Sequence, residues 1–334
     1  MNRKEILISA LRHQDSAYVP YAINMTGEGC DKYGEQLLKD YPNEQVMEDY
    51  RRGILDKMQA VQLAIGNHIL YINAPWWDWY NLTDEFLKEE DTPGRLPDTI
   101  GRGSYEQFFE KTRYLRETYD AYLLVTIWGS HWEKAYFSRG IENFLADLAG
   151  DPEWSQQLLD MIIRKNLVML ENILCCNDYE GVLLGSDWGT QRDLIMSPKC
   201  WKTMIQPGEQ QEYDLIKRYG KDVFIHSCGN IVKIMEELTQ MGVDALNPVQ
   251  PECMDLSELK RLYGDKIAFY GGISTQRTLP NGTPEQVARE TEQTIKLMSV
   301  HGGYITAPSQ EIQVDVPYEN LRALIDTARA HSIH

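Results

Sequence analysis

The sequence predicts a single (β/α)8 barrel, the TIM-barrel fold. This prediction depends on eight short apolar runs, on helical stretches between them, and on polar residues at the ends of the runs. Each crossover between parallel strands needs a helix, so strand–helix alternation favours a parallel sheet, and eight strands favour a closed one. An open doubly wound sheet is the alternative, but no glycine-rich turn follows the first run. We therefore expect residues 1–334 to form one α/β domain.

The expected strands are apolar runs bounded by turn residues. They span residues 18–23, 69–72, 123–127, 181–184, 223–226, 243–246, 267–270 and 303–306. The helices expected between them include 141–175, 198–218, 231–241, 256–263, 284–300 and 317–330, several with proline in the first turn. The early strands are spaced further apart, which predicts extra N-terminal helices and loops at the mouth, near 25–65 and 75–120.

The composition excludes several classes of function. The net charge is −17, with 50 acidic and 33 basic side chains, and such a surface repels phosphate backbones and anionic lipids. We therefore expect no nucleic-acid or membrane partner. The sequence shows no apolar stretch of roughly 18 residues, no secretory signal pattern and no disulfide spacing among its six cysteines. These features predict a cytoplasmic protein with reduced thiols.

Polar side chains follow the apolar runs at the points where barrel enzymes place their chemistry. Asn24 follows the first run, Asp187 the fourth and Asn247 the sixth, while His226 ends the fifth. The carboxyl ends of parallel strands meet at one rim, so these side chains are expected to face one cavity. Asn24 and Asn247 are the candidate substrate-binding residues of this group.

The triplet His226-Ser227-Cys228 predicts a metal site. Residues i and i+2 of a strand point to the same side, so the imidazole and the thiol can converge. Nitrogen and thiolate sulfur are ligands that zinc prefers, and a catalytic zinc has three protein ligands and one open position. The alternative is a buried cysteine beside a structural histidine. Cys253, after the sixth run, is a reserve ligand.

Two carboxylates are candidate catalytic residues. Asp187, in the segment GSDWGT, is expected beside His226, where it would orient the imidazole, bind substrate or act as a general base. Its alternative role is to cap its own loop. Glu133 follows the third run and would handle protons or act as a ligand at the mouth, with His131 as a substrate contact. Alternatively, Glu133 stabilises the N-terminus of the next helix.

The run Pro-Trp-Trp-Asp-Trp-Tyr holds three indoles within four residues, and one element cannot turn all of them inward. Tryptophan is enriched where flat ligands or partners bind. Trp76, Trp77 and Trp79 are therefore candidate walls of a substrate site. The alternative is a rigid loop that packs over the barrel helices.

From residue 185 onward the chain resembles the uroporphyrinogen decarboxylase-like superfamily, especially its methyltransferase branch. The resemblance is carried by GSDWGTQ (185–191), HSCGN (226–230), GVDALNPVQP (242–251), GDKIAFYGGISTQRTLPNGTPEQV (264–287) and GGYITAPSQEIQVDVPYEN (302–320). A weaker similarity covers residues 132–153. This resemblance implies a (β/α)8 barrel, in agreement with the strand pattern.

Two departures refine what the resemblance implies. True uroporphyrinogen decarboxylases carry an arginine-rich N-terminal segment for the substrate's carboxylates, whereas residues 21–29 here read YAINMTGEG. The methyltransferase branch holds zinc through His-x-Cys and a late cysteine. His226 and Cys228 match the first two, but Gln310 stands at the late position and becomes a candidate substrate contact. Either the site is incomplete, or a carboxylate supplies the third ligand, with Glu311 the candidate and another rim carboxylate the alternative. A carboxylate ligand makes zinc harder and better suited to an oxygen substrate.

The resemblance implies a methyltransferase that moves a methyl group between a small methylated substrate and the corrinoid (cobalamin) of a partner protein, with zinc assistance. The tryptophans favour a methoxylated aromatic substrate, and hence O-demethylation. Two alternatives stay open: a decarboxylase of the uroporphyrinogen decarboxylase type, and a non-catalytic barrel that binds a ligand or a corrinoid protein.

Overall fold

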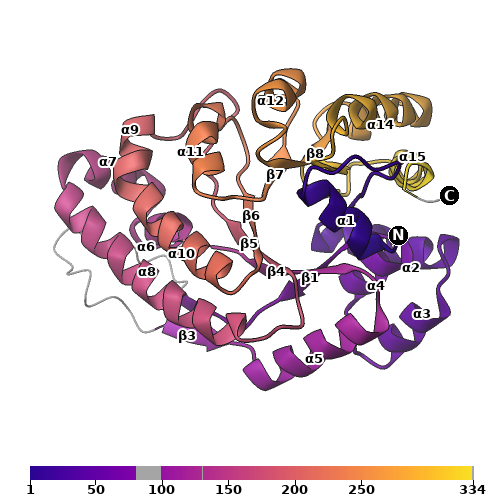
Figure 1. Ribbon diagram of the computed structural model, residues 1–334, viewed down its shortest axis with the longest axis horizontal. Helices are drawn as coiled ribbons and strands as arrows, with labels where there is room; N and C mark the ends of the chain where they lie inside the picture. The colour runs from indigo at the N-terminus through magenta and orange to yellow at the C-terminus, as the bar shows by residue number, and fades with distance from the viewer. Residues whose placement is uncertain (80–98, 130, 333–334) are drawn as a thin grey trace.

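A computed structural model describes residues 1–79, 99–129 and 131–332. Seven parallel strands form one curled sheet in the order β1-β4-β5-β6-β7-β8-β9, with helices packed around its outside (Figure 1). The strands are β1 (Ile69–Asn73), β4 (Tyr122–Ile127), β5 (Gly181–Gly185), β6 (Asp222–His226), β7 (Ala245–Val249), β8 (Ala268–Ile273) and β9 (Tyr304–Pro308). The predicted α/β barrel architecture is confirmed, with seven of the eight expected runs forming strands.

The remaining run, 18–23, is an extended segment that pairs only briefly. On one side it meets β9, where Ala22 donates its amide to the carbonyl of Thr306 (3.0 Å) and Thr306 donates to Pro20 (2.8 Å). On the other side His68, just before β1, donates its amide to the segment (2.9 Å). The segment therefore spans the gap between β9 and β1. Pro20 has no N–H to donate, which shortens the ladder.

A buried asparagine completes this closure. Asn67 accepts a hydrogen bond from the amide of Ile23 (2.9 Å) and donates one to the Ile23 carbonyl (3.0 Å). Its side-chain amide thus takes the place of a strand backbone. Each of these backbone groups would be buried without a partner if the amide were removed.

We expect Asn67→Ala to lower the free energy of unfolding by about 2–4 kcal/mol, because it leaves two buried backbone groups unsatisfied. Urea unfolding followed by circular dichroism measures the change. Asn281→Ala, at an exposed position, is the matched control and should stay within about 0.5 kcal/mol of the parent. Equal stability of the two variants would contradict the role given to Asn67.

The interior of the barrel is a separate apolar core. It draws residues from every strand of the large sheet and from helix α1 (Arg3–Leu11), which contributes Leu7 and Leu11. Both faces of the strands are buried, as expected for a parallel sheet covered by helices. Three members of this core, Ala22, Tyr270 and Ala307, also line a pocket at the carboxyl ends of the strands. The apolar filling therefore ends where that pocket begins.

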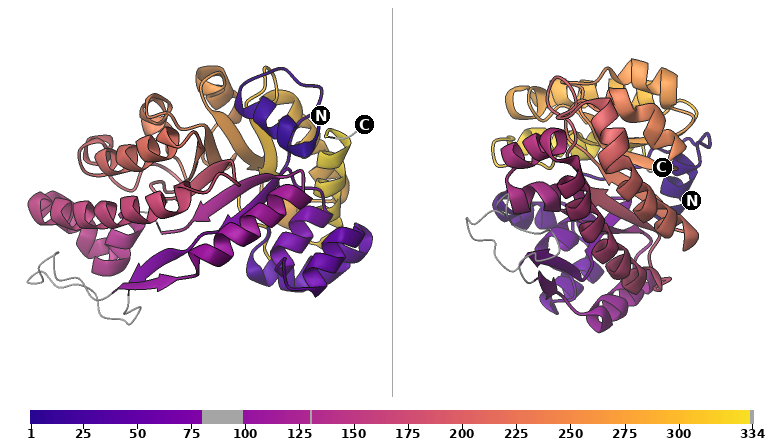
Figure 2. Two further views of the ribbon diagram at one scale, coloured as in Figure 1. Left: turned by 60° about the horizontal axis from the view of Figure 1, so that its bottom comes forward. Right: turned by 90° about the vertical axis from the view of Figure 1, so that its left-hand side faces the viewer.

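Helices follow the strands and cover the outside of the sheet (Figures 1 and 2). Those before β4 are α2 (Gly27–Asp40), α3 (Glu44–Arg51), α4 (Lys57–Ala64) and α5 (Tyr105–Thr118), which lie in the regions where extra helices were expected. Those after it are α6 (His131–Arg139), α7 (Ile141–Gly150), α8 (Pro152–Leu174), α9 (Pro198–Cys200), α10 (Gln206–Arg218), α11 (Met235–Gln240), α12 (Leu256–Tyr263), α13 (Thr278–Asn281), α14 (Pro284–Met298) and α15 (Tyr318–Ala330). No described helix is long and apolar enough to cross a membrane.

Three expected helices are divided at identifiable points. The stretch 141–175 breaks at Asp151, which caps α8, and Pro152 begins the new helix. The stretch 198–218 contains a π-helical turn, η2 (Trp201–Ile205), just before Pro207, which has no N–H for the regular ladder. The stretch 231–241 begins as a 3₁₀ helix, η3 (Val232–Ile234).

The tryptophan run forms a strand rather than a loop. Strand β2 (Trp76–Trp79) pairs antiparallel with β3 (Thr99–Arg102) in a separate two-stranded sheet. Figure 2 shows this hairpin at the same end of the molecule as α6, α7 and α8. Because side chains alternate along a strand, the run divides its indoles between two faces.

Candidate functional site

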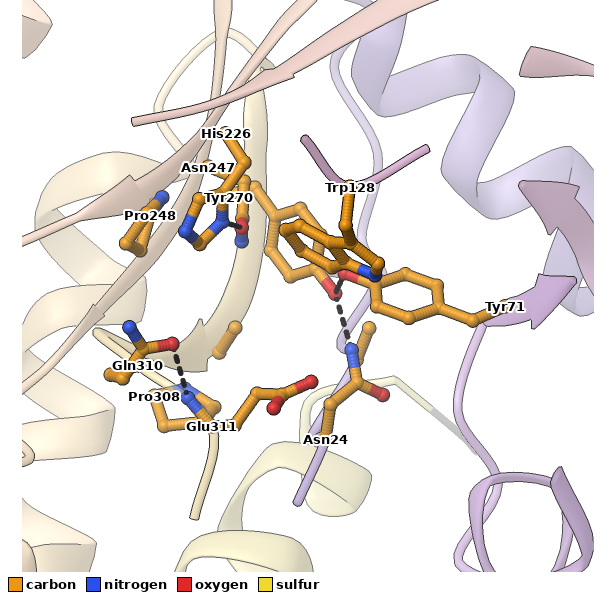
Figure 3. A pocket seen from close by; sticks show the side chains of 12 residues that line it. Asn24, Tyr71, Trp128, His226, Asn247, Pro248, Tyr270, Pro308, Gln310 and Glu311 are labelled. Carbon is orange, nitrogen blue, oxygen red and sulfur yellow. Dashed lines mark hydrogen bonds between the residues drawn. The ribbon is translucent and has the colours of Figure 1, made fainter. Parts of the chain in front are cut away.

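An open pocket of about 310 Å³ lies where the strands of the large sheet end. Figure 3 shows its lining, with the imidazole of His226 and the carboxylate of Glu311 pointing into it. Asn24, Asn247 and Gln310 also line it, so five of the predicted site residues meet here. These five residues line one cavity at the strand ends, and the roles expected of them stay predictions.

Asp187, His226 and Cys228 form a compact group beside the pocket. The Cys228 sulfur lies 3.5 Å from Nε2 of His226, and Oδ1 of Asp187 lies 3.8 Å from the same nitrogen. Their candidate ligand atoms all lie within 4.8 Å of one another. A tetrahedral zinc with bonds of about 2.0–2.3 Å spaces its ligand atoms roughly 3.3–3.6 Å apart, so nitrogen, sulfur and oxygen here fit one ion.

Two loops bring these residues together through direct backbone contact. The segment after β5 and the segment after β6 touch at Gly189 and Gly229, where added Cβ atoms would lie about 2.5 Å from the facing backbone. Gly229 also has a φ of +84°, which favours glycine. Asp187 then accepts a hydrogen bond from the amide of Cys228 (2.8 Å). Both glycines are needed to bring this carboxylate to the cysteine.

Asn247 orients the imidazole of His226. Its Oδ1 lies 2.7 Å from Nδ1 of His226, and because an amide oxygen only accepts, Nδ1 carries the proton. The lone pair of Nε2 therefore faces Cys228 and Asp187. A metal-binding histidine is usually fixed in this way by a hydrogen bond from its other ring nitrogen. Asn247, predicted as a substrate contact, here positions the histidine.

Burial strongly affects both groups. It lowers the pKa of His226, and together with the charge of Asp187 it raises the pKa of the Cys228 thiol to about 12. The imidazole is thus neutral near pH 7, as a ligand must be. A cation beside the sulfur would offset the cost of a buried thiolate, so this donor set is one that a metal ion stabilises.

Gln310 occupies the position expected for a further thiolate. Its side-chain nitrogen donates to the Cys228 sulfur at 3.2 Å, and its oxygen accepts from the amide of Glu311 (2.9 Å). The described residues place no second cysteine in the group of candidate ligands. Cys253, the reserve ligand, instead contacts Gln250 through weak sulfur hydrogen bonds.

Glu311 lies in the pocket but outside the metal-ligand group. Burial raises the pKa of its carboxyl group. Nearby, Asn24 donates to the hydroxyl of Tyr270 (3.0 Å), and that hydroxyl lies 3.0 Å from the hydroxyl of Tyr71. Glu311 thus shares a polar wall with these residues, opposite His226 in Figure 3.

The two acids lie in other places than their expected roles suggest. Asp187, expected to orient the imidazole, bind substrate or act as a general base, lies with His226 and Cys228 in the candidate ligand group, while Glu311, expected as a ligand, lies across the pocket. Glu133 accepts a hydrogen bond from the amide of Gly129 (3.0 Å), at the start of α6. This bond corresponds to the alternative considered for Glu133, because it satisfies an amide near the helix N-terminus.

His131 is not brought to the pocket. Its side chain is fully buried between α6 and α10, 3.2 Å from the carboxylate of Glu209. The helix begins at His131, and its side chain packs against Glu209 on α10 rather than lining the pocket. The expectation of a substrate contact at His131 is therefore wrong.

The tryptophans fall into different environments. Trp76 lines a second hollow of about 1310 Å³ that adjoins the pocket, whereas Trp77 is buried and donates its indole N–H to Asn166 (2.7 Å). The side chain of Trp79 lies outside the described residues. Trp77 also lines this hollow, but because it is almost fully buried, its main role is in packing.

The sequence reasoning missed the residue that joins the two hollows. Trp128 lines both, is 45% exposed, and meets the ring of His226 edge-on at a centroid distance of 5.0 Å. It is the first residue after β4, so the strand-end rule that found Asp187 applies to it as well. Tyr71 and Tyr270 were missed because they lie within strands.

Comparison with known proteins gives one family and several relatives. A family model described as uroporphyrinogen decarboxylase (URO-D) matches residues 83–331. The methylated-thiol–coenzyme M methyltransferase of Methanosarcina mazei is 24% identical over 71% of this chain and 59% of its own length. The methylcobamide:CoM methyltransferase of Methanosarcina barkeri is 26% identical over 39% of this chain and 36% of its own length. Each match thus spans less than two thirds of the relative.

A solved methyltransferase structure from Methanosarcina mazei has the same fold, with a TM-score of 0.69, 17% identity and 99% coverage of both chains.

Proposed function

The chain belongs to the uroporphyrinogen decarboxylase (URO-D) family. Within this family, we propose that it is a corrinoid-dependent methyltransferase rather than a decarboxylase. The observation that carries the proposal is the group of His226, Cys228 and Asp187 at the pocket. Methyltransferases among its relatives, one of them named for methylcobamide, support the same class of reaction.

In this proposal His226, Cys228 and Asp187 hold zinc. Zinc bound there would act as a Lewis acid on the heteroatom that carries or receives the methyl group. Asn247 keeps the imidazole in the required tautomer. A corrinoid supplied by a partner protein would accept or donate the methyl group at the mouth of the barrel.

Glu311 is the proposed proton carrier. Its half-buried carboxyl group has a raised pKa and points into the pocket, where it can hold a proton for the leaving heteroatom. Asn24 and Tyr270, bonded to each other on the same wall, orient the substrate. Trp128 covers the pocket beside His226 and reduces the access of water.

We propose a methoxylated aromatic compound as the substrate class. Trp76, Phe108 and Trp128 give the adjoining hollow flat apolar walls that suit a ring, and Lys111 places a cation among them. A donor set with one thiolate and one carboxylate gives a hard zinc, which favours an oxygen-bound methyl group. A thiol substrate is the second candidate, because both methyltransferase relatives are named for coenzyme M.

Decarboxylation of a polycarboxylate receives less support. The described lining of the pocket contains no arginine or lysine, and Glu311 adds an acidic group to it. Several carboxylates would therefore enter the pocket without a cationic partner, at a large desolvation cost.

The decisive experiment supplies zinc-loaded protein with cob(I)alamin as a substitute for the partner's corrinoid. A panel of methoxybenzoates and methylated thiols is tested for methylcobalamin formation by absorbance, and methylcobalamin plus a thiol tests the reverse direction. We expect turnover with a methoxybenzoate. Turnover only with thiols would overturn the substrate class. Binding without methyl transfer in either direction, or decarboxylation by metal-free protein, would overturn the function.

Gln310→Cys is expected to raise zinc affinity at least ~10-fold, because it adds a thiolate near Cys228, where the glutamine nitrogen now lies. Competition with a chromophoric chelator measures the affinity. Gln313→Cys, at an exposed position, controls for adventitious binding by a surface thiol. An unchanged affinity in Gln310→Cys would place the ion away from this side chain.

Asn247→Leu is expected to weaken zinc binding about 10–100-fold, because the similarly shaped leucine removes the acceptor that orients His226. Asn247→Asp keeps an acceptor and should bind zinc at least as tightly as the parent. The same chelator competition measures both variants. Parent-like binding by the leucine variant would show that the hydrogen bond has no role in the metal site.

A further inference from the structure

A second group of potential ligands lies away from the pocket, between helices α6, α8 and α10, which lie together on one flank of the barrel (Figure 1). It consists of His131 on α6 and of Glu209 and Glu212 on α10. The two glutamates are three residues apart, so they share one helix face. All three side chains are fully buried.

The spacing of the three side chains fits one metal ion. Nδ1 of His131 lies 3.2 Å from Oε1 of Glu209 and 4.0 Å from Oε2 of Glu212. A tetrahedral ion with bonds of about 2.0–2.1 Å holds its ligand atoms roughly 3.3 Å apart. The group therefore needs only small shifts to close around an ion. Gly208 leaves space for the imidazole, since an added Cβ would lie 2.8 Å from Nε2.

Each carboxylate has one oxygen held by a neutral neighbour and one oxygen without a partner. Ser186 donates to Oε1 of Glu209 (3.2 Å), and Asn166 donates to Oε1 of Glu212 (2.8 Å). By strict hydrogen-bond geometry, Oε2 of Glu209, Oε2 of Glu212 and both nitrogens of His131 lack a partner among the described residues. The buried Tyr213 hydroxyl also contacts Glu209, and the backbone of Ile205 contacts His131. Buried polar atoms are rarely left in this condition unless they serve a further ligand.

The negative charges of the two glutamates also need compensation. No ion pair with lysine or arginine is recorded for either glutamate within the described parts of the chain. Two buried carboxylates are therefore compensated either by protons or by a metal ion.

We propose that His131, Glu209 and Glu212 bind a second divalent transition-metal ion, zinc, in a closed structural site. An imidazole nitrogen disfavours magnesium and calcium, which take oxygen ligands. Full burial keeps a substrate from reaching the ion, which suits a structural site, and the second oxygen of one carboxylate would supply the fourth ligand. The ion would tie the start of α6 to α10, and Ser186 connects it to the segment that carries Asp187.

This site goes beyond the proposed function and is tested separately from it. The double variant His226→Ala/Cys228→Ser removes the first site and should retain about one zinc per chain, measured by mass spectrometry on protein purified without chelator. Glu212→Gln should lose the second zinc, while Glu292→Gln, on an exposed helix position, keeps both. A metal-free double variant would overturn the second site but leave the methyltransferase proposal intact.

Cobalt spectroscopy provides a readout that does not depend on the folding of the glutamate variant. Co²⁺ at a site of nitrogen and oxygen ligands lacks the near-ultraviolet thiolate band that Cys228 would give. We expect the double variant to bind Co²⁺ with visible bands only, and zinc X-ray absorption of the same protein to show no sulfur near 2.3 Å. No Co²⁺ binding, or a remaining sulfur signal, would mean that the group is compensated by protons.

Discussion

His226→Ala is expected to lower kcat/KM for methyl transfer by at least ~1,000-fold, equivalent to about 4 kcal/mol of lost transition-state stabilisation. The imidazole is the central member of the candidate ligand group, because its Nε2 lies within 4 Å of both the Cys228 sulfur and an Asp187 oxygen. Its removal takes away one of three ligands, and with it the Lewis acid at the pocket.

The measurement is methylcobalamin formation in the assay described above, together with zinc content. His301→Ala, whose side chain is 83% exposed, is the matched control and should keep both. If His226→Ala loses its zinc but transfers methyl groups at the parent rate, the metal is structural and the proposed chemistry is wrong.

Trp77→Ala is expected to lower the free energy of unfolding by about 3–5 kcal/mol, because it leaves a large cavity and removes a buried hydrogen bond. The indole is 1% exposed and donates to Asn166, which in turn donates to Glu212. The ammonium of Lys134 also lies 4.6 Å from its ring centroid. Trp77 thus connects the β2–β3 hairpin to the group between α6 and α10.

Trp76→Ala provides the comparison, because Trp76 is next to Trp77 in the run but lines the hollow and is only partly buried. Denaturant unfolding should show a change below about 1 kcal/mol for Trp76→Ala. Its effect should fall instead on KM for an aromatic substrate. If the two variants lose similar stability, the division of the tryptophans between packing and substrate binding is wrong.

Local sequence signals identified most of the fold. Seven apolar runs became strands because they are short, bounded by turn residues and buried on both faces. The missed helix break at Asp151 carried its own signal, a capping residue followed by proline. The first run differs because its pairing depends on Asn67, a residue more than 40 positions away whose side chain substitutes for a strand.

The candidate site was recognisable in part. The strand-end rule and the His-x-Cys spacing led to His226, Cys228, Asp187, Asn24 and Asn247. The same reasoning assigned His131 to the mouth, because sequence position next to a strand end does not say which way the first turn of a helix points. Glu209 and Glu212 lay on an ordinary amphipathic helix, and their partner on α6 could not be read from spacing.

The sequence by itself determined the barrel, the rim where the candidate site residues gather and the pairing of His226 with Cys228, because these follow from strand period and strand order. Only the tertiary structure decided that Asp187 joins the metal-ligand group while Glu311 faces it across the pocket. That choice depends on how far two loops can approach, and the contact between Gly189 and Gly229 sets this distance. Such contacts between distant segments leave no periodic pattern in the chain.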